Sequence, residues 1–248
     1  MLSKLQNKYI RSLSQQKIRD EHQVFIAEGI KIAEEWLKSR SKIQYIIAVE
    51  SWFSNNIDLT DNHPEAEQFV VKESELEMLS GLNTPNQVIL VVNKPAPSQI
   101  IIEKQWYLAL ENIQDPGNLG TMIRIADWFG IKQILCSEGC VDAYNPKVVQ
   151  AAMGSHLRVN VIKDNLPELL QKIPYTKYAA TLGGENIHKI KPVKAGVIII
   201  GNESKGLSED VIKSATCQVT IPRHGNSGAE SLNAGVSAGI LCALLLPC

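Results

Sequence analysis

The sequence predicts an α/β protein in two blocks, the second built on a mostly parallel sheet with helices on both faces. Strand-like and helix-like segments alternate through the second block, which is typical of parallel sheets. Residues 197–200 are apolar without a break, as expected of a strand covered on both faces. Two prolines in residues 93–99 interrupt regular structure, so the blocks are expected to divide there.

The first block, residues 1–92, is expected to form a small α/β domain. Apolar residues recur at helical spacing from Phe25 to Leu37, which predicts a helix over that stretch. Strand-like runs at 43–49, 68–71 and 87–92 and a short helix at 73–79 complete the predicted domain.

The second block, residues 106–248, follows a linker at 93–105. Its predicted strands are residues 106–111, 133–136, 159–162, 177–181, 197–201 and 218–221. Its predicted helices are residues 119–129, 146–153, 166–172, 209–214 and 232–246. Because ligands of such sheets bind beyond the carboxyl ends of the strands, the segments after these strands are the candidate site.

Composition excludes several whole-chain classes. The 248 residues are 44% hydrophobic and 21% charged, which argues against a disordered, collagenous or coiled-coil protein. No apolar run reaches the roughly 18–20 residues that a membrane span requires, and the start of the chain does not resemble a signal peptide. Five scattered cysteines without a C-x-x-C pair predict neither a disulfide framework nor a metal site. We therefore expect a cytoplasmic protein.

Charge is unevenly distributed although the formal net charge is only −1. The first 19 residues contain five basic side chains and no acid, namely Lys4, Lys8, Arg11, Lys17 and Arg19. Residues 41–81 contain eight acids and two lysines. The basic segment could bind nucleic-acid phosphates, or it could be a solvated helical face.

The first candidate loop follows the strand at 106–111 and reads ENIQDPGNLGTMIRIADWFG. Its D-P-G sequence predicts a tight turn, after which Asn118 could cap the next helix. Gly120 and Arg124, four residues apart, share one face of that helix. An ordinary cap and a surface arginine are the alternative interpretation.

The second and third candidate loops also combine glycine with polar side chains. The second, IIIGNESKGLS, places Gly201, Asn202 and Glu203 directly after an apolar strand. Neither P-loop spacing nor a G-x-G-x-x-G fingerprint occurs there. The third, IPRHGNSGAESLN, places Ser231 where a helix cap is expected and Asn233 in the first turn.

The order of these loops resembles a known family. N-x-x-D-P-G-N-x-G-x-x-x-R, then G-N-E-x-x-G-L, then I-P…E-S-L-N are similar to the three motifs of the SpoU (TrmH-type) RNA 2′-O-ribose methyltransferases of the SPOUT superfamily. FIAEGIKIAEEWL and LSGLNTPNQVILVV in the first block resemble the ribosomal-protein-like domain that binds RNA substrate in such enzymes.

The resemblance implies an S-adenosylmethionine-dependent enzyme that methylates a ribose 2′-hydroxyl of structured RNA, ribosomal RNA in preference to transfer RNA. Carried onto this sequence, it implies cofactor contacts by Thr181, Leu182, Gly183, Gly201, Ile221 and Leu232. It also implies catalytic-site roles for Arg124, Asn118, Glu203, Ser231 and Asn233. No metal is implied, because the sulfonium carbon is already electrophilic. From the charge distribution, Lys17 and Arg19 are the residues expected to contact RNA phosphates.

The resemblance leaves the role of Arg124 open between a general base and a charge that stabilises the developing oxyanion. It also implies a trefoil knot and a homodimer formed through the methyltransferase domain. The final helix would pack at the dimer interface, with burial inside one chain as the alternative.

Three other functions compete with this interpretation. A non-catalytic RNA-binding or ribosome-assembly protein could use the same fold without methyl transfer. A base methyltransferase of the same superfamily is disfavoured by the arginine of the first motif and by S-L-N in the third. A nicotinamide dehydrogenase would need the absent glycine fingerprint.

Overall fold

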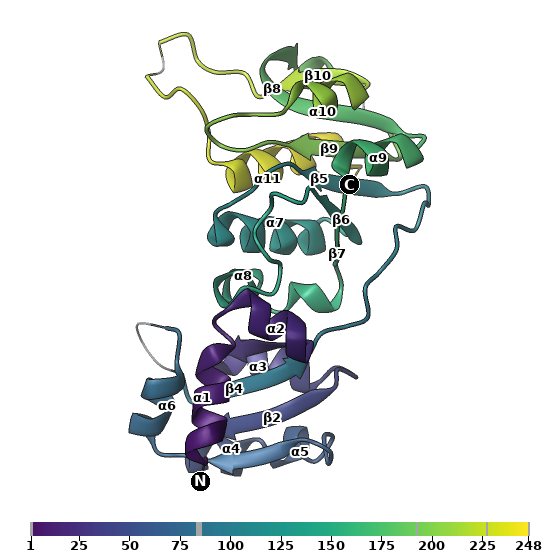
Figure 1. Cartoon of the computed structure of the whole chain (residues 1–248). Helices are drawn as coiled ribbons and strands as arrows, with labels where there is room; N and C mark the ends of the chain where they lie inside the picture. Colours follow the sequence, from purple (N-terminus) through teal and green to yellow (C-terminus); the bar gives the residue numbers. More distant parts are fainter. Residues whose placement is uncertain (1, 83–85, 192, 227, 248) are drawn as a thin grey trace. The chain divides into compact units, whose positions relative to one another are not determined.

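The computed structural model describes residues 2–82, 86–191, 193–226 and 228–247. The chain forms two compact units: Met1–Ala96 with Asp142–Leu157, and Pro97–Val141 with Arg158–Cys248 (Figure 1). The chain therefore passes between the units three times. The segment Asp142–Leu157, which the sequence assigned to the second block, belongs to the first unit. Within the described residues no helix is long and apolar enough to cross a bilayer.

The first unit contains a four-stranded sheet with the order β1-β4-β2-β3. The strands are β1 (Val24–Glu28), β2 (Ile43–Ala48), β3 (Glu67–Val70) and β4 (Val88–Asn93). β4 pairs antiparallel with β1 and β2, whereas β2 and β3 are parallel. Helices are α1 (Lys4–Ser12), α2 (Gln16–His22), α3 (Ile30–Leu37), α4 (Glu50–Asn55), α5 (Ile57–Thr60), α6 (Glu73–Leu79) and α8 (Pro146–Ala152).

Each face of this sheet carries its own hydrophobic core. Phe25 and Ala27 of β1 belong to one core, and Val24 and Ile26 belong to the other, because successive side chains of a strand point to opposite faces. All five residues of β1 are buried, so this strand shows no alternation of polar and apolar residues.

The predicted helix over 25–37 is therefore only half right. Residues up to Glu28 form β1, Gly29 turns the chain at φ +107°, and α3 begins at Ile30. A positive φ of this kind favours glycine. The predicted strands at 43–49, 68–71 and 87–92 are confirmed to within one residue at each end, and the helix at 73–79 is confirmed.

The segment Asp142–Leu157 completes the first unit. Val149 of α8 is a member of the core that contains Phe25, and the ring of Tyr144 lies 4.8 Å from that of Phe25. Helix α8 begins after Asn145, whose side chain accepts a hydrogen bond from the backbone of Lys147. Periodicity predicts this helix, but it does not predict which domain buries its apolar face.

The second unit contains a six-stranded parallel sheet with the order β10-β8-β9-β5-β6-β7. The strands are β5 (Trp106–Leu110), β6 (Gln133–Cys136), β7 (Asn160–Lys163), β8 (Thr176–Asn186), β9 (Gly196–Ile200) and β10 (Cys217–Thr220). The helices are α7 (Pro116–Trp128), α9 (Leu166–Lys172), α10 (Glu209–Ser214) and α11 (Ala234–Leu245). The predicted parallel sheet is confirmed.

Helices cover both faces of this sheet (Figure 1). Leu170 of α9 and Val211 of α10 share a core with one face of β5 and β9. On the other side α11 packs along α7. A Cβ at Gly235 would lie 3.3 Å from Thr121, and one at Gly239 would lie 3.6 Å from Ile125, so small residues let these two helices approach closely.

Candidate active site

The carboxyl ends of four neighbouring parallel strands meet at one edge of the second sheet. β10, β8, β9 and β5 lie side by side in that order, so the segments that follow them emerge along the same edge. These segments carry the three sequence motifs.

The first motif forms the turn into α7. Asp115 caps this helix, because its Oδ1 accepts the backbone N–H of Asn118 at 2.7 Å, and Pro116 occupies the first helical position. The prediction that Asn118 is the cap is therefore wrong. Asn118 instead stands in the first turn, where its side-chain amide is free to contact other segments.

Asn118 joins the three motifs through its side chain. Its Nδ2 donates to Glu203 Oε1 at 2.5 Å, across 85 residues of sequence. Its Oδ1 accepts from Asn233 Nδ2 at 2.8 Å, across 115 residues. We call this hydrogen-bonded set, Glu203–Asn118–Asn233, the motif bridge. Three of the predicted catalytic-site residues are thus in direct contact.

The third motif is anchored by Asn233 and not by Ser231. Asn233 Oδ1 accepts the backbone N–H of Val236 at 3.1 Å and caps α11. Ser231 was expected at this cap, but it lies two residues earlier in the exposed loop. A single side chain therefore starts the last helix and reaches the first motif.

Arg124 lies six residues along α7 from Asn118 of the motif bridge, which is about 9 Å, or about 1.7 turns, at 1.5 Å per residue. Its side chain is exposed, between the buried Ile123 and the partly buried Ile125. Among the residues that the structure describes, no carboxylate forms an ion pair with it. Its guanidinium is accordingly available to a ligand.

The second motif folds back on itself after β9. Asn202 and Gly206 exchange backbone hydrogen bonds at 3.1 and 2.9 Å. A Cβ at Gly201 would lie 2.5 Å from the carbonyl carbon of Gly206, so this close approach requires glycine. Sequence reasoning missed Glu111, which is buried at the base of this loop. The sequence feature that could have identified Glu111 is its position as an acid directly after an unbroken apolar strand.

The residues predicted to hold the cofactor lie in the middle of β8 and in the segments after β9 and β10. In the β8–β10 ladder Ala179 faces Gln218 while Glu185 faces Val219, so residues 180–184 leave the ladder as a bulge. Thr181, Leu182 and Gly183 form the middle of this bulge. The predicted strand at 177–181 thus continues as a longer, irregular strand.

The chemistry of these segments fits an adenosyl group. Leu182, in the bulge of β8, is 80% exposed, and Leu232 is 47% exposed. Leu232 and the partly buried Ile221 follow the neighbouring strand β10. Gly183 and Gly201 present backbone groups without side chains. Apolar walls combined with main-chain donors and acceptors suit a nucleoside ligand.

The predicted RNA contacts divide into one exposed and one buried residue. Lys17 on α2 is exposed. Arg19 is only 1% exposed, and its guanidinium donates to the carbonyls of Leu13 and Ser14 at 2.8 Å and to Asp142 at 2.5 Å. The prediction that Arg19 contacts RNA is wrong, because burial and these partners occupy its donors.

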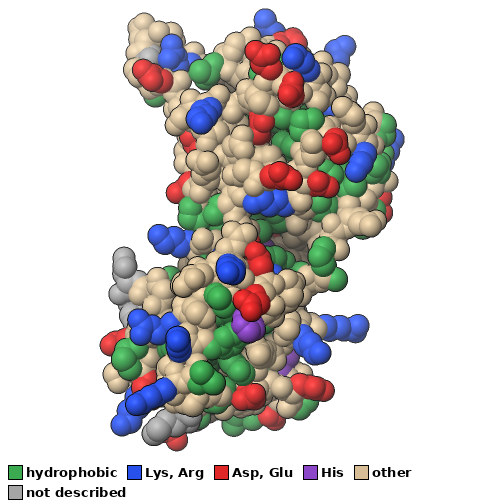
Figure 2. Space-filling view, viewed as in Figure 1, with side chains coloured by type: hydrophobic (Ala, Val, Ile, Leu, Met, Phe, Trp, Pro, Cys, Tyr) green, Lys and Arg blue, Asp and Glu red, His purple; other side chains and the backbone are tan. Residues whose placement is uncertain are grey.

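Helix α1 supplies other exposed cations. Lys4, Lys8 and Arg11 are exposed at a spacing that places them on one helix face. Figure 2 shows Lys and Arg side chains gathered over this side of the first unit.

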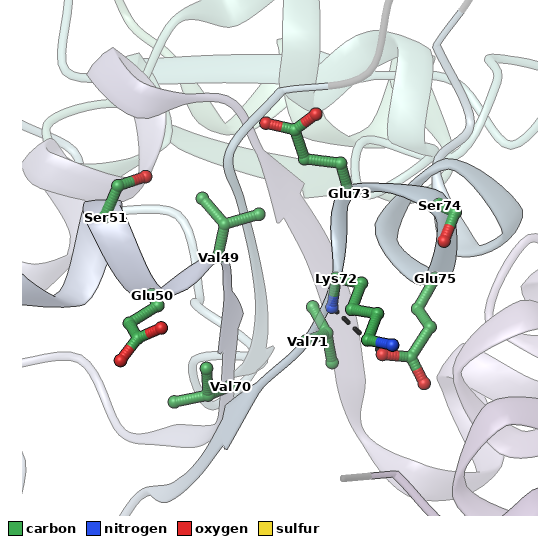
Figure 3. A pocket seen from close by; sticks show the side chains of 9 residues that line it. All are labelled: Val49, Glu50, Ser51, Val70, Val71, Lys72, Glu73, Ser74 and Glu75. Atoms are coloured by element: carbon green, nitrogen blue, oxygen red, sulfur yellow. Dashed lines mark hydrogen bonds between the residues drawn. The ribbon is translucent and has the colours of Figure 1, made fainter.

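A hollow in the first unit lies at the carboxyl ends of its two parallel strands. This cavity of about 660 Å³ is lined by Val49, Glu50, Ser51, Val70, Val71, Lys72, Glu73, Ser74 and Glu75. Figure 3 shows the three valines among the acids, with the backbone N–H of Lys72 bonded to Glu75 at 2.9 Å. Three carboxylates against one lysine make this cavity unsuited to phosphate.

Comparisons with known proteins agree with this arrangement. Residues 105–243 match the SpoU rRNA Methylase family, and residues 5–90 match the MRM3-like substrate binding domain. A curated relative in Bacillus subtilis, 23S rRNA (guanosine(2553)-2′-O)-methyltransferase RlmP, is 29% identical over 93% of this chain and 92% of its own.

Solved structures extend the likeness over both units. A protein of the TrmH family of RNA methyltransferases from Porphyromonas gingivalis is 31% identical, covers 99% of this chain and 98% of its own, and has a TM-score of 0.86. An AdoMet-bound rRNA methyltransferase from Sinorhizobium meliloti is 27% identical over 98% of this chain and 95% of its own, with a TM-score of 0.87.

Proposed function

This chain belongs to the SpoU rRNA methylase family, and from that membership we propose that it methylates a ribose 2′-hydroxyl of ribosomal RNA with S-adenosylmethionine. The motif bridge is the observation that carries the proposal, because it assembles the polar residues of all three motifs at one edge of the sheet. The ribose specificity rests on the first and third motifs and on the name of the Bacillus relative.

The bulge of β8 and the segments after β9 and β10 would bind the cofactor. Leu182, Ile221 and Leu232 would enclose the adenine, and backbone groups near Gly183 and Gly201 would bind its polar edge. Bound S-adenosylmethionine supplies an electrophilic methyl group on a sulfonium. The chain itself must then orient the ribose hydroxyl in line with that group, and such positioning contributes several kcal/mol to catalysis.

Arg124 acts as a fixed positive charge in this proposal. A guanidinium keeps its proton in proteins, so we assign Arg124 electrostatic stabilisation of the developing 2′-oxyanion. Its exposed position on α7 also allows a bidentate contact with an RNA phosphate.

The first unit would bind the RNA substrate. Lys4, Lys8 and Arg11 on α1 and Lys17 on α2 are exposed cations that can contact phosphates without reading sequence. The acidic cavity at Glu50, Glu73 and Glu75 would repel the backbone.

A homodimer is also part of the proposal. Val236 is 52% exposed and Leu244 is 41% exposed on α11, and Trp128 at the end of α7 is 84% exposed. These apolar side chains leave one face of the second unit for a second copy, while Leu241 and Leu245 are buried within the chain. A Val236→Glu/Leu244→Glu variant should then be monomeric in light scattering; a dimer of unchanged mass would contradict this interface.

The test of the methylation proposal uses labelled S-adenosylmethionine and RNA from cells that lack the protein. A 2′-O-methyl group blocks alkaline cleavage at its own position, so the modified nucleotide can be mapped. We expect one resistant site in ribosomal RNA. Arg124→Ala should abolish the label and retain cofactor binding measured by calorimetry.

The matched control is Lys213→Ala, which removes an exposed cation of α10 (70% exposed) and should not change labelling. Cofactor binding without any label on ribosomal RNA would contradict the substrate assignment. Absence of both cofactor binding and label would favour the non-catalytic RNA-binding alternative.

A further inference from the structure

Glu111 is a buried carboxylate at the junction of the first and second motifs. It directly follows β5 and is 6% exposed. Its Oε2 accepts the backbone N–H of Ser208 at 2.7 Å, and its Oε1 accepts the hydroxyl of Ser208 at 2.6 Å. Burying a carboxylate is costly unless donors satisfy both oxygens. Residue 208, which is 97 positions later in the chain, supplies both donors.

Asn112, the residue after Glu111, holds the start of the second-motif loop, residues 202–208. The carbonyl of Asn112 accepts from Asn202 Nδ2 at 2.9 Å, and Asn112 adopts a left-handed conformation with φ +53°. Asparagine tolerates this conformation better than most residues. Asn202 Oδ1 in turn accepts the backbone N–H groups of Ser204 and Lys205, each at 3.0 Å.

Two consecutive residues of the first candidate loop, Glu111 and Asn112, thus clamp residues 202–208 at both ends. Between the two clamps lies Glu203, which accepts the hydrogen bond of Asn118. The clamp therefore determines where the backbone of the second motif stands at the edge of the sheet, while the Glu203 carboxylate itself is held by Asn118. Glu111 itself is shielded from solvent, so it acts on ligands only through this loop.

We propose that Glu111 is a positioning residue for S-adenosylmethionine: its carboxylate holds residues 202–208 in the conformation that binds the cofactor. This inference rests on the proposed function. Glu111 touches neither cofactor nor RNA, so its loss should weaken cofactor binding more than it slows methyl transfer by the loaded enzyme.

Glu111→Gln is the sharpest variant. It keeps the size of the side chain but removes its charge and turns one acceptor into an amide donor, so the charge-assisted hydrogen bonds from Ser208 are lost. A hydrogen bond to a charged group contributes enough that its loss should raise the cofactor Kd about 10–30-fold. Calorimetry reports this Kd for the folded fraction only. The methylation rate at saturating cofactor should stay within about threefold.

A second readout separates positioning from general destabilisation. In Glu111→Gln, hydrogen exchange should accelerate at the amides of Gly206 and Ser208 and remain slow in β5 and β9. Ser208→Ala removes the hydroxyl, which donates to Glu111 and also accepts the backbone N–H of Val211 as the cap of α10, and should raise the Kd about threefold. Glu111→Asp should fall between Glu111→Gln and the wild type. These milder variants test the inference even if Glu111→Gln does not fold.

Glu28→Gln is the matched control. Glu28 is the buried carboxylate of the first unit, 7% exposed, and it accepts from the Ser80 hydroxyl and from the Gly81 backbone at 3.1 Å. The same chemical change there should leave the cofactor Kd unchanged. A wild-type Kd in Glu111→Gln, or equal effects of the two variants, would overturn the inference. Failure of the wild-type protein to bind cofactor would instead contradict the proposed function.

Discussion

Two hydrogen-bonded clusters join distant parts of the chain, one in each unit, and they differ in their access to solvent. In the first unit Arg19 reaches Asp142 across 123 residues, and their side chains are 1% and 10% exposed. In the second unit the motif bridge spans 85 and 115 residues at the rim of the sheet, where Glu203 and Asn233 are exposed.

The difference shows that burial separates polar groups that serve folding from those that serve binding. A buried ion pair has no surface left for a ligand, and removing one partner leaves an unpaired charge in the interior. An exposed bridge adds little to stability but keeps unused acceptors facing solvent. Four experiments test this difference between the two clusters.

The largest expected effect is on the stability of the first unit. Asp142→Ala leaves the Arg19 guanidinium buried without its counter-charge and should lower the free energy of unfolding by about 3 kcal/mol. Urea unfolding followed by the fluorescence of Trp36 and Trp52 measures this change. Lys38→Ala, which removes an exposed pair with Glu34, should change it by less than about 0.5 kcal/mol. Equal effects of the two variants on the free energy of unfolding would show that burial does not set the contribution of an ion pair here.

The motif bridge should show the opposite pattern. Asn118→Asp replaces the donor that faces Glu203 by a second carboxylate and should slow methylation about 100-fold, a change of about 2.7 kcal/mol in the barrier. The unfolding free energy should change by less than about 0.5 kcal/mol.

The control for this variant lies in the same unit. Asn165→Asp makes the same change beside Glu168, to which Asn165 donates at 2.9 Å, and it lies away from the motifs. It should leave the methylation rate unchanged. A loss of stability in Asn118→Asp comparable to that of Asp142→Ala would show that the bridge is structural.

Lowering the pH should destabilise the first unit, which contains the buried cluster. Burial lowers the pKa of His156, beside Asp142 in the first unit, from 6.5 to about 4, and among the described residues its Nδ1 has no hydrogen-bond partner. The unfolded chain therefore binds a proton more readily between these values, so stability present at pH 7 is lost as the pH falls. Between pH 7 and pH 5 the loss should be about 2 kcal/mol.

Urea midpoints of the first unit against pH test this prediction. His156→Gln should flatten the dependence, whereas His22→Gln, at an exposed site on α2, should preserve it. A slope unchanged by His156→Gln would assign the acid sensitivity to other groups.

The smallest of the four effects concerns RNA affinity. Lys8→Glu with Arg11→Glu reverses two exposed cations of α1 and should weaken RNA binding about tenfold and lower its salt slope by about 1.4. Lys31→Glu with Lys42→Glu makes the same charge change elsewhere in the first unit. If both double variants weaken binding equally, net charge and not the α1 face determines affinity.

Sequence patterns predicted the parallel sheet because its strands are short apolar runs with clear boundaries. They failed at β1, where five buried residues and helix-like spacing conceal a strand. Tyr144 and Val149 help to bury the side of β1 that carries Phe25. They lie more than a hundred residues away in the sequence, so no local pattern around β1 predicts this contact.

The sequence predicted which residues belong to the candidate active site, but it did not predict which of them contact one another. The motifs identify Asn118, Glu203 and Asn233, but helix-cap preferences placed the caps at Asn118 and Ser231 instead of Asp115 and Asn233. The burial of Arg19 depends on a partner in another segment, as does the role of Glu111. Such tertiary pairings are invisible to composition and periodicity.

The late position of Asp142–Leu157 has a consequence for synthesis on the ribosome. Translation delivers Met1–Ala96 first, then the 45 residues from 97 to 141, and only then the segment that covers Phe25. At about 5–20 residues per second, the nascent first unit waits several seconds with an apolar face of its sheet incompletely covered. The chain therefore cannot finish its first unit before it has begun its second.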